Sequence, residues 1–171
     1  MKCLGGLVVL LIGTAGFAAS VVPGPGSGVP NASRARVNWM LKCQGCHRPD
    51  ASGSPETTPT MAGQVARFLA APEGRDYLAR VPGVATAALP DDQLAELLNW
   101  TLLTFDAAHV PTDFKPYSPQ EIGALRLRPL RTDAPAMRAR IMAVLSKNKP
   151  QSEVQEGEFN GKNRQGGTPP G

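Results

Sequence analysis

One pentapeptide, Cys43-Gln44-Gly45-Cys46-His47, constrains the fold of this chain more than any other part of its sequence. Two thiols three positions apart can each add across one vinyl group of a haem, and the adjacent imidazole then lies beneath the iron. Such a fold must project both sulfurs from one side of a helix. A thiol pair also suits zinc binding or thiol–disulfide exchange, so other features of the chain have to separate the three chemistries.

The amino-terminal segment predicts export. Met1-Lys2 carries one positive charge, residues 4–19 form a nearly unbroken apolar run, and small residues close it. This is the three-part layout of a secretory signal peptide, which we expect over residues 1–20. A retained membrane anchor is the alternative, but it needs about 20 apolar residues to cross a bilayer. Cys3 precedes the apolar run, so we expect it to leave with the signal.

Cysteine arithmetic then favours haem. The chain has three cysteines, and removal of the signal leaves only the two of the pentapeptide. A redox disulfide of this spacing needs strand–helix–strand flanks, which the neighbouring segments do not show. Structural zinc needs four ligands, and the only other histidine, His109, completes an improbable set, because adjacent Cys46 and His47 rarely reach one metal. We predict one covalent haem c on Cys43 and Cys46, with His47 as proximal axial ligand.

Composition divides the exported chain into a folded middle and two polar ends. Residues 21–31 are rich in glycine and proline and are predicted to form a flexible leader. Residues 146–171 contain two apolar side chains, too few to offset their ordering entropy, and are predicted to form a disordered tail. The formal charge of +4 falls towards neutrality once Lys2 is removed and two propionates are added. This balance favours neither nucleic acid nor strong membrane association after signal cleavage.

The folded part is predicted to be all-α, because few segments alternate apolar and polar residues. The first helix, residues 32–43, runs into the haem motif with Ser33 as its cap and Val37, Met40 and Leu41 at helical spacing. A loop follows over residues 48–60. Further helices are expected over residues 63–71, 90–103, 119–127 (capped by Ser118) and 134–145.

Residues 37–105 together resemble a class I cytochrome c, in which a helix enters the haem motif and a later helix crosses the first. Pro59, in Thr58-Pro59-Thr60-Met61-Ala62-Gly63, stands twelve residues after His47 and is similar to the family's Pro-x-Leu-x-Gly. The resemblance implies a helical fold around the haem, over residues 32–105. It also implies that the Pro59 carbonyl orients the His47 ring, as partners of metal ligands do. Residues 106–145 are expected to form a helical C-terminal extension beyond the minimal fold.

The sequence departs from the family on the other side of the iron. The family's distal methionine usually precedes the later helix, and Val81 stands at that position here. The candidates for a second axial ligand are Met61, His109, Met137 and Met142, besides an iron without a second protein ligand. Arg75, with Arg48 and Arg80 as further candidates, is a possible partner for the haem propionates, because arginine pairs with carboxylates in two-pronged fashion.

A small exported protein with one haem is expected to pass single electrons between redox partners in the periplasm, for example a dehydrogenase and an oxidase chain. It could act alone or as a subunit of a complex. No catalytic acid–base pair or second redox centre is visible, so the chain is not expected to be an enzyme on its own. One alternative is a haem protein with an open or labile sixth site that binds a small ligand, as a sensor, carrier or peroxidase-like protein. The other alternative is a structural subunit whose haem is mainly a folding core.

Overall fold

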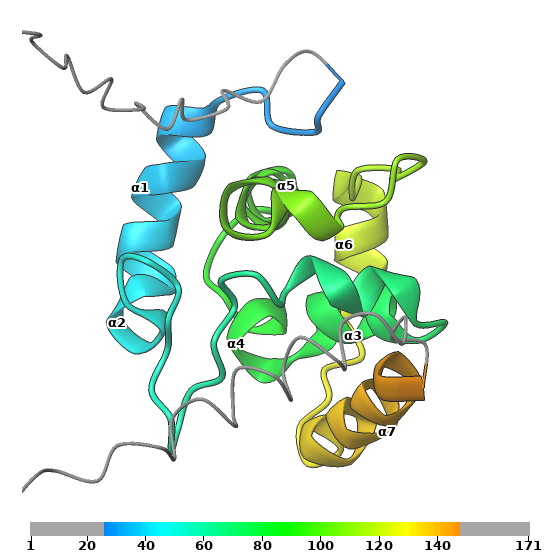
Figure 1. The fold of residues 1–171 in the computed structure, drawn as a ribbon. Coiled ribbons are helices and arrows are strands. Elements are labelled where there is room, and N and C mark those ends of the chain that lie inside the picture. The colour runs from blue at the N-terminus through cyan, green and yellow to red at the C-terminus, as the bar shows by residue number, and fades with distance from the viewer. Residues whose placement is uncertain (1–25, 148–171) are drawn as a thin grey trace, which may run out of the picture.

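The computed structural model describes residues 26–147, so the predicted signal peptide and nearly all of the predicted tail lie outside the described residues. The elements are α1 (Ala32–Lys42), α2 (Gln44–His47), η1 (Ala66–Ala70), α3 (Gly74–Arg80), α4 (Pro82–Ala85), α5 (Asp91–Phe105), η2 (Ala107–His109), α6 (Pro119–Arg126) and α7 (Ala134–Lys147). Within the described part, the only extended pairing is an isolated bridge between Ser54 and Thr58. The predicted all-α fold is confirmed (Figure 1).

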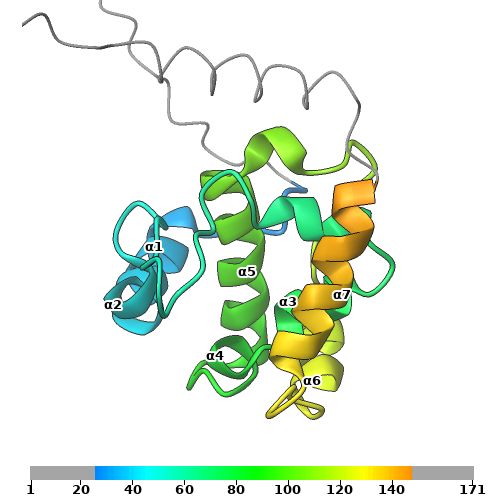
Figure 2. The same cartoon turned by 60° about the horizontal axis from the view of Figure 1, so that its bottom comes forward.

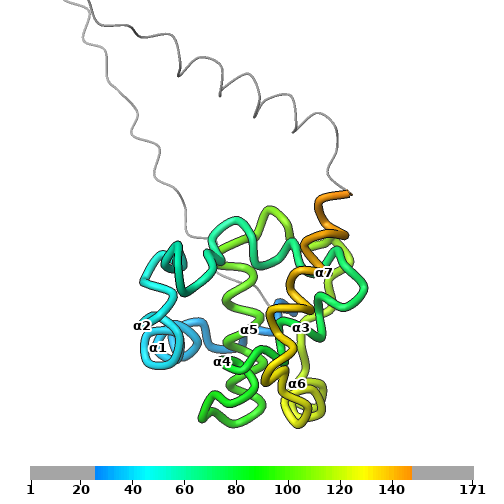
Figure 3. Tube along the Cα trace, turned by 90° about the horizontal axis from the view of Figure 1, so that it is seen from below, coloured from blue at the N-terminus to red at the C-terminus, as the bar shows by residue number. Residues whose placement is uncertain are grey.

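Helix α5 is the centre of the fold. Helix α1 packs against one side of it and α6 against the other, while α3 and α7 lie beyond α5 from α1 (Figures 2 and 3). Nine consecutive residues of α5, from Leu94 to Leu102, are buried, because the helix has neighbours around most of its circumference. Pro90 precedes the helix and two aspartates occupy its first turn, where negative charge complements the helix dipole.

Helix α1 has the predicted length but presents a different face to the core. Ala35, Asn38 and Trp39 are buried against α5, whereas Val37, Met40 and Leu41 are 51%, 51% and 70% exposed. The small Ala35 allows close approach, and the Trp39 ring fills the space beside Trp100 and Phe105, at centroid distances of 6.2 and 4.6 Å. The prediction that the Val37, Met40 and Leu41 stripe faces the core is therefore wrong.

The helix ends follow local chemistry only in part. Ser118 caps α6 as predicted, because its side chain accepts a hydrogen bond from the Glu121 N–H at 3.1 Å. At α1 the cap is Asn31, whose side chain accepts from the Arg34 N–H at 2.9 Å, so the prediction of Ser33 is wrong. The segment predicted as a helix over residues 63–71 forms only the 3₁₀ turn η1. Helices α3 and α4 were not predicted, because four to seven residues show too little periodicity.

A buried glutamate joins α5 to the start of α1. Glu96 is 1% exposed, and its carboxylate accepts hydrogen bonds from the Asn31 N–H at 2.6 Å and the Arg34 Nε–H at 2.7 Å. Val29, just before this junction, is also buried. The last residues of the predicted flexible leader are thus packed against the helical core.

The C-terminal extension shares the core of the preceding helices. Ile122, Leu125, Met137 and Ile141 belong to one buried cluster with Leu98 and other side chains of α3, η1 and α5. Residues 106–147 therefore close over the same interior as residues 32–105. No helix within the described residues is both long and apolar enough to cross a membrane.

Candidate haem site

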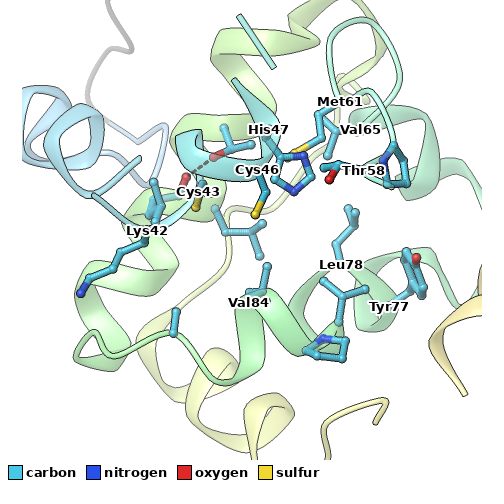
Figure 4. Close-up of a pocket in the computed structure, with 18 of the residues that line it drawn as sticks. Lys42, Cys43, Cys46, His47, Thr58, Met61, Val65, Tyr77, Leu78 and Val84 are labelled. Atoms are coloured by element: carbon cyan, nitrogen blue, oxygen red, sulfur yellow. Dashed lines mark hydrogen bonds between the residues drawn. The ribbon is translucent and has the colours of Figure 1, made fainter. Parts of the chain in front are cut away.

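A cavity of about 560 Å³ lies between the Cys43–His47 segment and helices α3, α4 and α5 (Figure 4). Its walls are mostly apolar, with side chains from η1, α3, α4 and α5, and α7 contributes Ala134 and Arg138. The volume lies within the range of about 300–1,000 Å³ that is typical of ligand pockets. The sequence motif therefore opens onto a space large enough for a prosthetic group.

Both motif cysteines line this cavity. Cys43 ends α1, and the short helix α2 follows at once because the Cys43 carbonyl accepts from the His47 N–H at 3.0 Å. This turn carries the Cys43 and Cys46 sulfurs to the same side of the chain (Figure 4). Both are free thiols. Burial raises the pKa of Cys43 to about 11, with a smaller contribution from Cys46, so this thiol is protonated at neutral pH.

The His47 ring stands in the same cavity. Its Nδ1 atom is buried and makes no hydrogen bond of ordinary geometry, although the Pro59 carbonyl lies close enough to act on the ring. Burial lowers the pKa of His47, and the Pro59 carbonyl opposes part of this shift. The lowered pKa favours the neutral imidazole, which is the form that binds a metal.

The loop after the motif brings Pro59 to His47. Gly53 donates its N–H to the His47 carbonyl at 3.0 Å, and the Ala51 carbonyl accepts from the Met61 N–H at 2.8 Å. Gly53 has φ +67°, and a Cβ atom there would lie 2.3 Å from the Thr58 carbonyl oxygen. Only glycine therefore fits where the loop crosses itself.

Replacing Gly53 with alanine is expected to lower the free energy of unfolding of the holoprotein by about 2–3 kcal/mol, because the new methyl group meets the backbone at a left-handed position. Chemical denaturation followed by circular dichroism measures this loss. Gly63 is the matched control: it has φ +65° but open space around its Cβ position, so Gly63→Ala should cost only about 1 kcal/mol. Equal losses in the two variants would show that the close approach at Gly53 contributes nothing.

Met61 lies on the same wall of the cavity as His47. In Figure 4 its side chain stands beside the His47 ring, whereas Leu78 and Val84 line the wall across the cavity. Val81, at the position where the family usually has its distal methionine, also lines the cavity. A haem held by His47 would thus have its free face against aliphatic side chains.

The other candidate axial ligands lie elsewhere. His109 is on η2 and its Nδ1 atom pairs with the buried Asp106 carboxylate, which also accepts from the Ala66 N–H at 2.8 Å. Met137 is buried in the core, 5% exposed, and Met142 is 37% exposed. None of these three residues lines the cavity, because each belongs to an element whose cavity-facing positions are taken by other side chains or that packs away from it.

The predicted propionate partner, Arg75, is also away from the cavity. Its guanidinium pairs with Glu121 through two contacts of 2.6 and 2.7 Å and lies 4.1 Å from the centroid of the Tyr117 ring. Arg80 donates to the Arg128 carbonyl at 2.7 Å, and exposed Arg48 is not part of the cavity wall. The cations that do line the cavity are Lys42 and Arg138. The four-residue spacing of Ala134 and Arg138 placed both on one face of a helix, but nothing in the sequence said that this face closes a cavity.

The residues present fit a haem better than the alternatives. Two free thiols and a neutral imidazole meet at one end of a largely apolar cavity, with a buried Nδ1 atom available for a backbone partner. Across residues 26–147, no three His, Cys, Asp or Glu side chains gather closely enough to hold a metal ion, which argues against structural zinc.

Comparison with known proteins supports this fit. The chain is 32% identical over 107 residues to cytochrome c-552 of Thermus thermophilus, a match covering 52% of this chain and 82% of that protein. A second cytochrome c-552, from another strain of the same species, is also 32% identical over 107 residues and is covered over 72% of its length. No protein-family profile matches the chain. No solved structure matches it either.

Proposed function

This chain belongs to the c-type cytochrome family, and we propose that it carries one haem c on Cys43 and Cys46, with His47 as proximal iron ligand, and passes single electrons between redox proteins. The observation that carries the proposal is that both thiols and the imidazole of the motif face one apolar cavity. Membership of the family makes covalent haem c the cofactor and electron transfer the general function.

The haem, when bound, supplies a one-electron iron couple. The chain's own residues supply its setting. The neutral His47 ring would bind the iron, and the Pro59 carbonyl would hold its Nδ1 proton and so orient the ring. Leu78, Val84 and their aliphatic neighbours exclude water, and such burial disfavours the more highly charged oxidation state.

The surface beside Cys46 suits a redox partner. Cys46 is exposed, and the exposed Val37, Met40 and Leu41 of α1 lead up to it. Lys42 and Arg48, both exposed, carry positive charge at the margin of this patch. We propose that the partner is a redox protein that presents an apolar contact with acidic residues around it.

Export to the periplasm is the proposed location. It rests on the signal-like order of residues 1–20, a charged start, an apolar run and small residues. Haem attachment to the exported chain would agree with the two remaining cysteines being used as thioethers. A dehydrogenase and an oxidase chain remain the proposed kinds of donor and acceptor.

The test is spectroscopic. Protein purified from a host that matures c-type cytochromes should show a Soret band, keep its pigment in acidified organic solvent, and titrate reversibly as one electron per chain in a redox cell. Pigment that is extracted into the solvent would contradict covalent attachment. A covalently bound haem that exchanges no electron with mediators would contradict electron transfer and favour a structural haem.

The aliphatic wall across from His47 favours a second candidate function, the binding of a small uncharged ligand such as carbon monoxide or nitric oxide. Leu78, Val81 and Val84 cannot ligate iron, and Met61 stands on the His47 side. This function predicts a high-spin ferrous spectrum and rapid uptake of carbon monoxide. Low-spin spectra in both oxidation states, lost on Met61→Leu substitution, would instead identify Met61 as the sixth ligand and exclude this second function.

A further inference from the structure

The C-terminal helix α7 brings a cation to the cavity. Arg138 lines the cavity wall, is half-buried, and holds its guanidinium carbon 5.8 Å from the centroid of the Phe68 ring. None of the ion pairs formed among residues 26–147 includes Arg138. Arg140, two residues further along α7, is 60% exposed and pairs with Glu73 at 3.7 Å. The two arginines on one helix thus have different environments.

A tyrosine stands beside this cation. Tyr77 of α3 is 8% exposed, lines the cavity, and stacks on Phe68 with a centroid distance of 5.3 Å and an interplanar angle of 12°. Burial raises the pKa of Tyr77, while the charge of Arg138 opposes the shift. The Tyr77 hydroxyl therefore stays protonated at neutral pH and can donate a hydrogen bond. Phe68 holds both groups, the Tyr77 ring by stacking and the Arg138 guanidinium by a cation–π contact.

These two donors are at the far end of the cavity from the cysteines. Figure 4 shows Cys43 and Cys46 at one end and Tyr77 at the other. Figures 2 and 3 show α2 and α7 on opposite sides of α5. In a haem the two propionate chains leave from the edge away from the vinyl groups, so vinyl groups fixed at the cysteines direct the carboxylates towards α3 and α7. A carboxylate in an apolar cavity needs a charged or hydrogen-bonding partner.

We propose that Arg138 and Tyr77 form a carboxylate-binding site for a haem propionate, so that the C-terminal extension completes the haem site. This inference rests on the proposed haem attachment at Cys43 and Cys46. Arginine suits the role because its planar fork pairs with a carboxylate through two hydrogen bonds. Arg138 takes the place that the sequence assigned to Arg75, whose guanidinium is committed to Glu121.

The test compares Arg138→Gln with Arg140→Gln in the holoprotein. Loss of a cation beside the haem stabilises the ferric state, which carries the extra positive charge, so Arg138→Gln should lower the midpoint potential while Arg140→Gln leaves it near wild type. Arg138→Gln should also shift the propionate bending band in the resonance Raman spectrum. Arg138→Lys, which keeps the charge without the fork, should restore most of the potential but not the Raman band.

Tyr77→Phe gives an independent reading, because it removes the hydroxyl and keeps the ring that stacks on Phe68. It should shift the same Raman band without unfolding the protein. A wild-type potential and Raman band in Arg138→Gln and Tyr77→Phe, with a normal Soret band, would overturn this inference and leave the proposed function standing. A wild-type protein without covalent haem would instead remove the proposed function itself.

Discussion

Substituting serine for both Cys43 and Cys46 is expected to reduce covalently bound haem to background and to unfold most of the described domain. The first effect follows because the two thiols are the only groups of the cavity able to form thioethers. The second follows from the volume that the haem would occupy. At about 24 cal/mol per Å³, an unfilled cavity of about 560 Å³ costs about 13 kcal/mol. A domain has a total stability of about 5–15 kcal/mol.

The measurements are haem content after acid–solvent extraction and the far-ultraviolet circular dichroism of the purified chain. Each single variant, Cys43→Ser or Cys46→Ser, keeps one thioether and should retain covalent haem with a shifted pyridine haemochrome band. Cys3→Ser is the control for a cysteine outside the motif and should leave haem content per mature chain unchanged. Wild-type covalent haem in the double variant would show that the attachment lies elsewhere.

Substituting alanine for Asn99 is expected to cost about 3 kcal/mol in the free energy of unfolding. Asn99 is completely buried in α5 and joins three parts of the chain. Its side-chain amide donates to the Gly28 carbonyl at 3.1 Å and the Tyr117 carbonyl at 3.0 Å, and its oxygen accepts from the Tyr117 N–H at 2.8 Å. Truncation leaves these backbone groups without their partner in an interior that water does not reach.

Chemical denaturation of the holoprotein, followed by the fluorescence of Trp39 and Trp100, measures the loss. Asn38 is the matched control, since it is also a buried asparagine but makes one hydrogen bond, to Gln93 at 3.3 Å. Asn38→Ala should cost about 1 kcal/mol. If the two variants were equally stable, the buried Asn99 network would not be what joins the leader and the extension to α5.

The chemistry of the site could be predicted from sequence where it is local. The thioether and imidazole positions are five consecutive residues, so a single turn of helix decides their mutual placement. The partner for His47 also comes from a short loop, and Pro59 lines the cavity as that loop predicts. Helix lengths were predictable for the same reason, because periodicity over ten or more residues reflects one continuous buried face.

What could not be predicted depends on contacts between distant residues. The apolar Val37, Met40 and Leu41 looked like the inner face of α1, but Trp39 and Ala35 fit against α5 more closely. Arg75 was one of several arginines, and only its position beside Glu121 on α6 shows that its charge is already paired. His109 is near the end of α5 in sequence, and the buried Asp106 holds it there.

Neighbouring residues along the chain specify the covalent chemistry, the helical class and the position of the proximal imidazole, because these depend on groups within one or two turns of one another. Folding in three dimensions selects the wall that the cavity presents to the free face of the iron and the cation that reaches it. Those outcomes depend on how α3, α4 and α7 pack around α5, and packing selects among similar side chains by shape and distance, which spacing along the chain does not record.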